Sequence, residues 1–110
     1  MDKETLLKKA SSASFKQANG QVLRTINILR EKYNKLEVVQ SVLTDSGIDL
    51  GSFVDSVNFL SMEGYIQLRT IDGKIEADIA DNSYKDLEAK VTGKGVRLLA
   101  GNISDEMIEV

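Results

Sequence analysis

The side chains able to do chemistry in this chain are carboxylates, hydroxyls and amines, because histidine and cysteine are absent. Without histidine, the chain lacks the side chain that most often serves as a general base or zinc ligand near neutral pH. Without cysteine it has no thiolate nucleophile, thiolate metal site or disulfide, which agrees with a reducing compartment. We therefore expect a protein that is not an enzyme and that carries no cofactor.

The remaining candidate sites for a metal or a nucleotide are weak. Asp45 with Asp49, and Glu76 with Asp78, could hold a hard cation, but neighbouring acids on turns and strands are usually solvated. The Thr-Gly-Lys-Gly run that begins at Thr92 lacks the preceding glycine-rich loop of a phosphate-binding site. We interpret this run as the capped start of a helix.

The chain carries 14 Lys and Arg against 17 Asp and Glu, and the two signs are unevenly distributed. Residues 1–40 hold eight cations and four acids, a net charge of 8 − 4 = +4. Because the whole chain has a net charge of −3, residues 41–110 have a net charge of −7. Such an asymmetry can orient a protein on a polyanion or place two copies head to tail. Chance segregation on solvated helix faces explains it about equally well.

Length and composition predict one small folded domain with a single core, at 110 residues and 42% apolar content. No apolar run is long enough to cross a bilayer, and the first residues lack the apolar core of a signal peptide. We expect a cytoplasmic protein without membrane contact. We divide the chain into an N-terminal arm or short helix (1–18), a folded domain (19–101) and an acidic C-terminal tail (102–110).

The spacing of apolar residues predicts three core helices, over residues 21–33, 36–45 and 50–63. A break at Asn19-Gly20 would separate the first of these helices from the arm.

Short polar residues and glycines mark the ends of the second and third helices. Asn34 and Asp49 are placed to cap their N-termini. Gly47 and Gly64 suit their C-termini, where a residue often adopts positive φ.

The second half of the chain predicts a small antiparallel sheet. Residues 65–71 and 74–79 alternate in polarity, and Asp72-Gly73 between them suits a two-residue type I′ turn. Residues 87–91 alternate again as a third strand. Thr92 then caps a last helix that closes at Gly101.

This order of elements resembles the winged helix-turn-helix superfamily over residues 21–100. Leu60–Ile66 looks like the end of a recognition helix entering the first wing strand, and Val91–Gly95 like the start of the final helix of small bacterial regulators. More narrowly, Phe53–Ile66 is similar to the YjcQ-like proteins of Gram-positive bacteria and their phages. The resemblance implies an α+β winged-helix fold with a three-helix core, a two- or three-stranded antiparallel wing sheet and a C-terminal helix.

The resemblance also implies a small DNA-binding protein, an accessory factor or transcriptional regulator of bacterial or phage type that dimerises through the arm and terminal helices. Helix 50–63 would enter the major groove of double-stranded DNA, and the wing over 69–76 would lie along the backbone or minor groove. Asn58 is the strongest candidate for base reading, because Asn pairs bidentately with adenine. Simple solvation remains the alternative for each polar residue. The other implied contacts are Ser52 and Ser56 on the helix and Arg69 and Lys74 in the wing.

Charge opposes this mode of binding. Residues 41–63 contain four acids and neither Lys nor Arg, although affinity for a duplex comes largely from cations that neutralise phosphates. If DNA is bound, we expect the phosphate contacts to come from cations earlier in the chain. These are Lys16, Arg24, Arg30, Lys32 and Lys35.

A competing hypothesis is a protein-interaction module whose acidic third helix docks on a partner. Phe59 and Met62 lie well around the helix from the stripe that contains Phe53, and aromatic and Met side chains are frequent anchors at interfaces. Together with Asp55 they would form the docking surface. The alternative is that the arm or residues 87–91 cover Phe59 and Met62.

Overall fold

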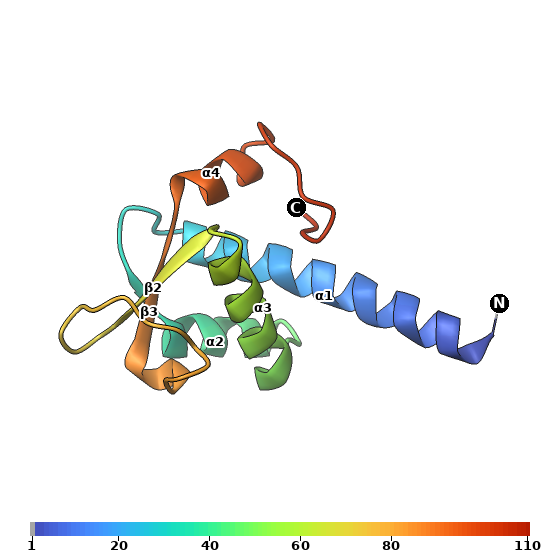
Figure 1. The fold of residues 1–110 in the computed structure, drawn as a ribbon, viewed down its shortest axis with the longest axis horizontal. Coiled ribbons are helices and arrows are strands. Elements are labelled where there is room, and N and C mark those ends of the chain that lie inside the picture. The colour runs from blue at the N-terminus through green and yellow to red at the C-terminus, as the bar shows by residue number, and fades with distance from the viewer. Residues whose placement is uncertain (1) are drawn as a thin grey trace.

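The computed structural model describes residues 2–110, apart from the side chains of residues 8–13, so Lys8 and Lys9 lie outside the described side chains. Helices and a small antiparallel sheet confirm the predicted α+β class. The elements, shown in Figure 1, are α1 (Lys3–Asn27), β1 (Asn34–Lys35), α2 (Leu36–Asp45), α3 (Leu50–Met62), β2 (Ile66–Thr70), the 3-10 turn η1 (Tyr84–Asp86), β3 (Leu87–Val91) and α4 (Gly93–Leu99).

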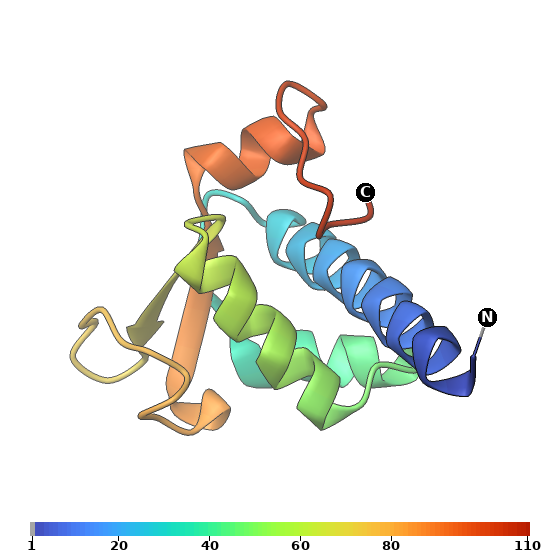
Figure 2. The same cartoon turned by 45° about the vertical axis from the view of Figure 1, so that its right-hand side comes forward.

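The three strands lie in the order β1-β3-β2, with β3 antiparallel to both neighbours. One face of the sheet is apolar and packs against the helices, with α1 contacting both α3 and β3 (Figures 1 and 2). Phe53, Leu23, Ile26 and Leu60 are fully buried between these layers. The core thus lies between the helices and the inner face of the sheet.

Helix α1 runs without interruption through Asn19 and Gly20, so the predicted break there is wrong. The helix also ends at Asn27 rather than at residue 33. Asn19 is fully buried, and its Nδ2 donates a hydrogen bond to the carbonyl oxygen of Met107 at 2.9 Å. A Cβ at Gly20 would lie 1.7 Å from the carbonyl oxygen of Glu109. These two residues are therefore needed for packing against another segment of the chain, and they do not mark a change in chain direction.

That segment is the C-terminal one, residues 102–110, which returns to α1 (Figure 1). Ile108 is buried in the core, and the Glu109 N–H donates to the carbonyl oxygen of Lys16 at 3.0 Å. The Tyr65 hydroxyl donates to Asp105 Oδ2. Burial, together with this bond to a carboxylate, raises the pKa of Tyr65 to about 12. The tail is thus part of the folded body.

The predicted helix ends are confirmed at four positions. Gly47 and Gly64 have positive φ, at +89° and +80°. Asp49 accepts the Ser52 N–H at 2.8 Å, and Thr92 accepts the Gly95 N–H at 3.2 Å, as N-caps do.

The predicted two-residue hairpin is wrong. Positive φ occurs at Gly73 and Lys74, whereas a type I′ turn needs it at residues 72 and 73. The turn spans residues 71–74, and it is closed by the Thr70 N–H, which donates to the carbonyl oxygen of Ile75 at 2.8 Å. Beyond it, only Glu76 forms a bridge, with Arg69, so residues 74–79 are not a strand. The third predicted strand, β3, is confirmed and pairs with β2 instead.

The first part of α1 extends beyond the rest of the molecule (Figures 1 and 2), and the whole chain measures 51 × 31 × 24 Å along its principal axes. This projecting part is residues 3–14, which lie within the arm predicted over residues 1–18. Leu6 and Leu7 in the arm are 54% and 60% exposed. Although α1 is long, neither it nor any other helix within residues 2–110 has the apolar character needed to cross a membrane.

Candidate nucleic-acid interface

The strand register gathers charged side chains on the side of the sheet that faces away from the core, here termed the outer face. Lys35 of β1 and Arg69 of β2 flank Glu88 of β3, and Gln67 pairs with Lys90. Because successive side chains on a strand point to opposite faces, Glu88 and Lys90 lie opposite the apolar side chains of β3. Three segments distant in sequence thus bring their cations together.

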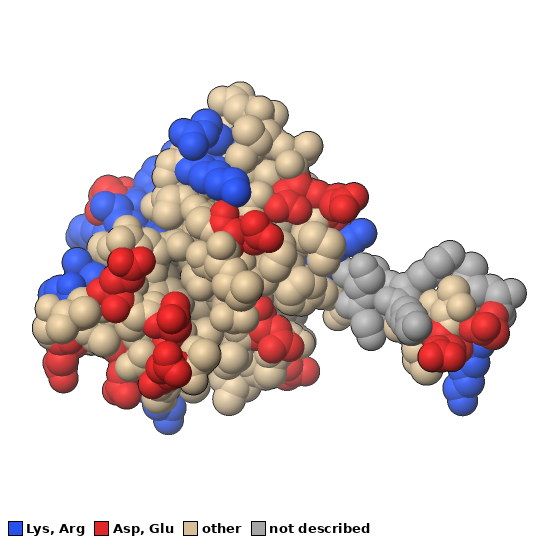
Figure 3. Space-filling model, viewed as in Figure 1, with Lys and Arg blue, Asp and Glu red and all other residues tan. Residues whose placement is uncertain are grey.

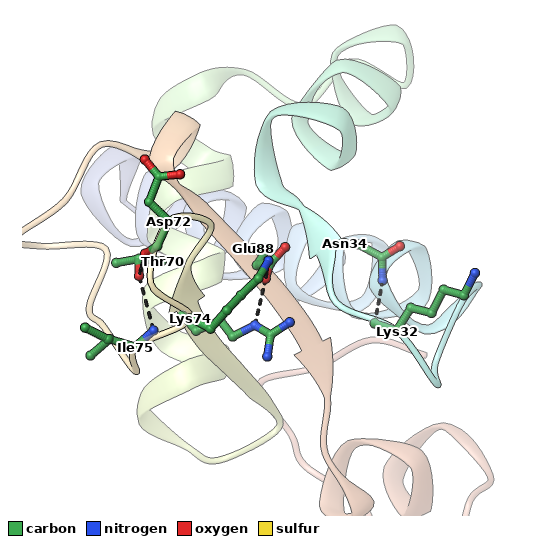
Figure 4. Close-up of polar contacts among 8 residues, drawn as sticks. Lys32, Asn34, Thr70, Asp72, Lys74, Ile75 and Glu88 are labelled. Atoms are coloured by element: carbon green, nitrogen blue, oxygen red, sulfur yellow. Dashed lines mark hydrogen bonds and ion pairs between the residues drawn. The ribbon is translucent and has the colours of Figure 1, made fainter.

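Glu88 is the centre of this surface. Arg69 Nε donates to Glu88 Oε1 at 2.7 Å, and Lys74 Nζ donates to the same oxygen at 3.0 Å (Figure 4). Burial of Glu88, which is 5% exposed, raises its pKa, but the hydrogen bonds and charges of the two cations outweigh this and hold the pKa below its ordinary value. Two cations on one carboxylate leave a net positive charge.

Tyr33 supplies the aromatic part of the outer face. The Arg69 guanidinium carbon lies 3.5 Å from the centroid of the Tyr33 ring, and Lys90 Nζ lies 5.9 Å from it. Both distances fall within the range of cation–π attraction. Arg69 is therefore held by both Tyr33 and Glu88, which fixes the direction of its guanidinium group.

Asn34 fixes the loop over residues 28–33 that leads to this surface. Its Nδ2 donates to the carbonyl oxygens of Ile26, Leu29 and Lys32 at 3.3, 3.4 and 3.1 Å. Asn34 therefore satisfies carbonyls left over at the end of α1 and does not cap α2, which has no side-chain cap. Figure 4 shows Lys32 on this loop, beside Asn34 and pointing away from the sheet. Arg30, on the same loop, is exposed.

The outer face, its loop and the turn over residues 71–74 thus combine six cations with Tyr33 and four carboxylates, an excess of two positive charges; besides the two carboxylates named next, these are the exposed Glu31 on the loop and Asp72 in the turn. The cations are Arg30, Lys32, Lys35, Arg69, Lys74 and Lys90, and the other two carboxylates are the paired Glu88 and, opposite Arg69 in a bridge, Glu76. Figure 3 shows Lys and Arg along the left edge of the molecule and over α4 at the top, with Asp and Glu spread over the middle and lower parts of the same view.

Helix α3 presents the opposite charge. Asp55 and Asn58 are exposed on it, and Asn58 Nδ2 contacts Met62 Sδ at 3.4 Å. Asp49 caps its first turn, and the hydrogen bonds from Ser52 lower the pKa of Asp49, which keeps it ionised. Ser52 is half-buried beside that cap. Helix α3 itself contains no Lys or Arg, so a phosphate approaching its first turns meets the carboxylates of Asp49 and Asp55; a cation, Lys94, lies only at its C-terminal end, where Lys94 Nζ donates to the carbonyl oxygen of Glu63 at 2.8 Å.

Ser56 is not available to a DNA base, because it is fully buried in the core. Its Oγ has no hydrogen-bond partner within the described residues. At 100° per residue, Ser56 is on the same side of α3 as Phe53 and Val57, and both of these are buried.

The predicted phosphate contacts divide into two groups. Arg30, Lys32 and Lys35 belong to the surface described above. Lys16 and Arg24 lie on α1 beside the C-terminal segment, where the Lys16 carbonyl accepts from Glu109. The structure thus unites the loop and wing cations and leaves the two α1 cations apart.

The two apolar residues proposed as protein anchors, Phe59 and Met62, differ in how far they are exposed. Phe59 is half-buried, with its ring edge to face against Phe15 of α1 at a centroid distance of 5.5 Å, so α1 covers it. Met62 is 77% exposed. One of the two proposed protein anchors is therefore covered, and the other is open.

Sequence reasoning missed Tyr33, Glu88 and Lys90. The helical spacing over residues 21–33 predicts a core position for Tyr33, and the apolar alternation over residues 87–91 predicts only a strand. The same alternation places Glu88 and Lys90 on the opposite face, so this signal was present in the sequence.

Glu88→Gln should change the pH dependence of stability. Because the folded-state pKa of Glu88 lies below its unfolded value, its contribution is fully present above the unfolded pKa and is lost as pH falls through the folded pKa. Denaturation in urea from pH 7 to pH 3 should show wild type losing stability more steeply than Glu88→Gln, with Glu37→Gln, an exposed acid, as control. Parallel curves for wild type and Glu88→Gln would contradict this account of the network.

Searches against protein-family models, curated proteins and solved structures gave no match to this chain, so its function is inferred from the geometry above.

Proposed function

We propose that this chain is a winged-helix protein that binds double-stranded DNA through the outer face of its sheet and the loop before β1, and not through α3. The observation that supports this best is the assembly of Lys35, Arg69, Lys74 and Lys90 on one surface, where Lys35, Arg69 and Lys74 lie beside Glu88 and where Arg69 and Lys90 lie beside Tyr33. Cations at such a surface neutralise phosphates, which is the main source of affinity for a duplex.

The order of elements supports the winged-helix assignment. A helix, a short strand, two helices joined by a tight turn and two further strands follow one another, and the first strand pairs with the last, in the order β1-β3-β2. The loop over residues 71–86, which joins β2 to β3, then corresponds to the wing. In this assignment α3 is the element that would read bases in the usual mode, and its acidic surface is the reason for placing the DNA elsewhere.

Binding through this surface should be weakly dependent on sequence. Lys and Arg contacts to phosphates position a protein on a duplex but carry no base information. An accessory factor or regulator of bacterial or phage type, as the resemblance implies, could use such a surface to stay on DNA while another component provides specificity.

Fluorescence anisotropy with a labelled mixed-sequence duplex tests this function. We expect binding at low salt, with an affinity that falls as salt rises by about 0.9 logarithmic units per unit of log salt for each phosphate contacted. A duplex of unrelated sequence should bind about equally well. Absence of binding at high micromolar protein and low salt, for several unrelated duplexes, would reject the proposal.

The exposed Met62 supports a second candidate function, in which α3 docks on a protein partner. Its weakness is that Phe15 covers Phe59, so a single apolar anchor remains among carboxylates. Met62→Ser should leave duplex binding unchanged in the anisotropy assay if DNA lies on the outer face. A loss of duplex affinity in Met62→Ser would instead place the DNA against α3.

A further inference from the structure

Two contacts hold the Arg69 guanidinium group in place on the outer face. Its Nε donates to Glu88 Oε1 at 2.7 Å, and its central carbon lies 3.5 Å from the centroid of the Tyr33 ring. The second distance is that of two planar groups in contact, so the guanidinium lies against the face of the ring. The bond to Glu88 prevents the group from turning over that face. The direction of the guanidinium is therefore set before any ligand arrives.

The terminal nitrogens of Arg69, Nη1 and Nη2, are left for a ligand. A guanidinium presents five N–H donors in its plane, and Glu88 uses the one on Nε. Within the part of the chain that the structure describes, neither terminal nitrogen has a hydrogen-bond or ion-pair partner. The side chain is 29% exposed, so it remains open to solvent. The edge that carries both terminal nitrogens can thus meet an incoming anion.

An edge of this form matches a phosphate group. One N–H of each terminal nitrogen points away from the side chain in the same direction, and each can donate to one phosphate oxygen. Such paired bonds are the usual form of Arg–phosphate recognition, and they require the guanidinium to have one orientation. Tyr33 and Glu88 already provide that orientation.

Two further cations lie close enough to act on the same phosphate. Lys74 Nζ donates at 3.0 Å to the Glu88 oxygen that Arg69 uses, and Lys90 Nζ lies 5.9 Å from the centroid of the ring that Arg69 covers. Charges interact over roughly 8 to 10 Å at physiological salt, so both ammonium groups attract an anion held by Arg69. Glu88 repels it, but three cations outweigh this one carboxylate.

We propose that Arg69 is a preformed clamp for one phosphate group, which its two terminal nitrogens hold by paired hydrogen bonds while Lys74 and Lys90 add positive charge. The inference rests on the proposed function for the source of this phosphate, which is the backbone of double-stranded DNA. An ordered side chain loses less conformational entropy on binding than a free one. Arg69 therefore contributes more affinity than its single charge does, and it gives the duplex one fixed point on the outer face.

Arg69→Lys tests the clamp at constant charge. Lysine keeps the positive charge but cannot form the paired bonds, so duplex affinity in low-salt anisotropy should fall about tenfold. Lys35→Arg is the matched control, because it exchanges the same two residue types on exposed β1 of the same surface. It should bind at least as tightly as wild type, and circular dichroism checks that both variants are folded. Arg69→Lys protein that binds as tightly as wild type would overturn the clamp, as would an equal loss in Lys35→Arg.

Two substitutions of Tyr33 test whether the ring orients Arg69. Tyr33→Leu removes the surface on which the guanidinium lies, so duplex affinity should fall about threefold. Tyr33→Phe keeps the ring and should bind like wild type. Equal losses in the two variants would mean that the hydroxyl group contacts DNA, and no loss in Tyr33→Leu would mean that the ring does not position Arg69.

Inorganic phosphate tests the clamp without DNA. In a proton–nitrogen correlation spectrum, the Arg69 Nε–H signal should be visible, because its bond to Glu88 slows exchange with water. Millimolar phosphate should shift this signal more than sodium chloride does at the same ionic strength, and more than it shifts those of Arg24, Arg30 and Arg97. An unresponsive Arg69 signal would overturn the clamp. A responsive signal in a protein that binds no duplex would keep the clamp and reject the proposed function.

Discussion

Gly20→Ala is expected to lower the free energy of unfolding by about 2 to 4 kcal/mol, although the same change in a helix interior normally stabilises a protein. The added Cβ would lie 1.7 Å from the carbonyl oxygen of Glu109, which no rotation of a side chain can relieve. The C-terminal segment must therefore leave α1. Separation exposes Ile108 and breaks the hydrogen bonds that link Met107 to Asn19 and Glu109 to Lys16.

Urea denaturation measures this loss, and hydrogen exchange shows where it arises. The Glu109 amide, which donates to Lys16 in wild type, should lose its protection in Gly20→Ala, while the amides of β3 keep theirs. Gly51→Ala is the matched control: it is also a helical glycine, but the nearest atom to its Cβ is 3.6 Å away. It should be as stable as wild type or more so. Equal stability of the two variants would mean that the contact between Gly20 and Glu109 is not a close one.

Lys35→Glu/Lys90→Glu is expected to weaken duplex binding by roughly 100-fold at low salt, which corresponds to about 2.7 kcal/mol. Each change removes a cation from the outer face and puts a carboxylate there, so phosphates are repelled where they were attracted. Neither side chain is buried, and neither forms an ion pair among the described residues, so the fold should be retained. Anisotropy at fixed ionic strength measures the affinity, and circular dichroism checks the fold.

Lys16→Glu/Arg24→Glu changes the net charge by the same amount and is the matched control. It should reduce affinity much less, because these residues lie on α1, apart from the outer face. Equal losses in both double variants would show that only net charge matters and would remove the outer face as the site. Asp55→Lys provides an independent check: a large gain in affinity would indicate that DNA approaches α3.

Local signals in the sequence were sufficient for most of the fold. Gly47, Gly64, Asp49 and Thr92 were assigned correctly, because a cap or a positive φ is decided by a few neighbouring residues. Asn19-Gly20 carries the same type of signal, yet α1 continues through it. Its role is to admit the backbone of residues 107–109, which follow almost ninety positions later, and no local pattern reveals such a contact.

The prediction of a two-residue hairpin is wrong for a related reason. Asp72-Gly73 does lie in a turn, but Lys74 takes positive φ and its amine reaches Glu88 on β3. The returning chain pairs with β2 through one bridge, between Arg69 and Glu76, with backbone hydrogen bonds on either side of it, from Thr70 N–H to Ile75 O and from Ala77 N–H to Leu68 O. Alternating polarity over residues 74–79 predicts a longer strand than this short pairing provides.

The candidate site was predictable in its parts and not in its assembly. Lys32, Lys35, Arg69 and Lys74 were all singled out from the sequence, in two separate roles. The pairing of β1 and β2 with β3 places Lys35 and Arg69 beside Glu88, to which Lys74 also reaches, while Lys32 lies on the loop before β1; Tyr33 joins them through Arg69. Strand order in a small sheet is a tertiary property, so it is not encoded in the spacing of residues within any one strand.

The bond between Asn19 and Met107 joins residues that are 88 positions apart, and this separation has a kinetic consequence. Closing a loop costs entropy that grows with its length, by about 0.6 kcal/mol for each doubling. Proteins rich in such distant contacts fold more slowly than those built from neighbouring ones. Refolding should therefore proceed with α2, α3 and the turns between them forming early, and with residues 102–110 reaching α1 in the last step to the native state.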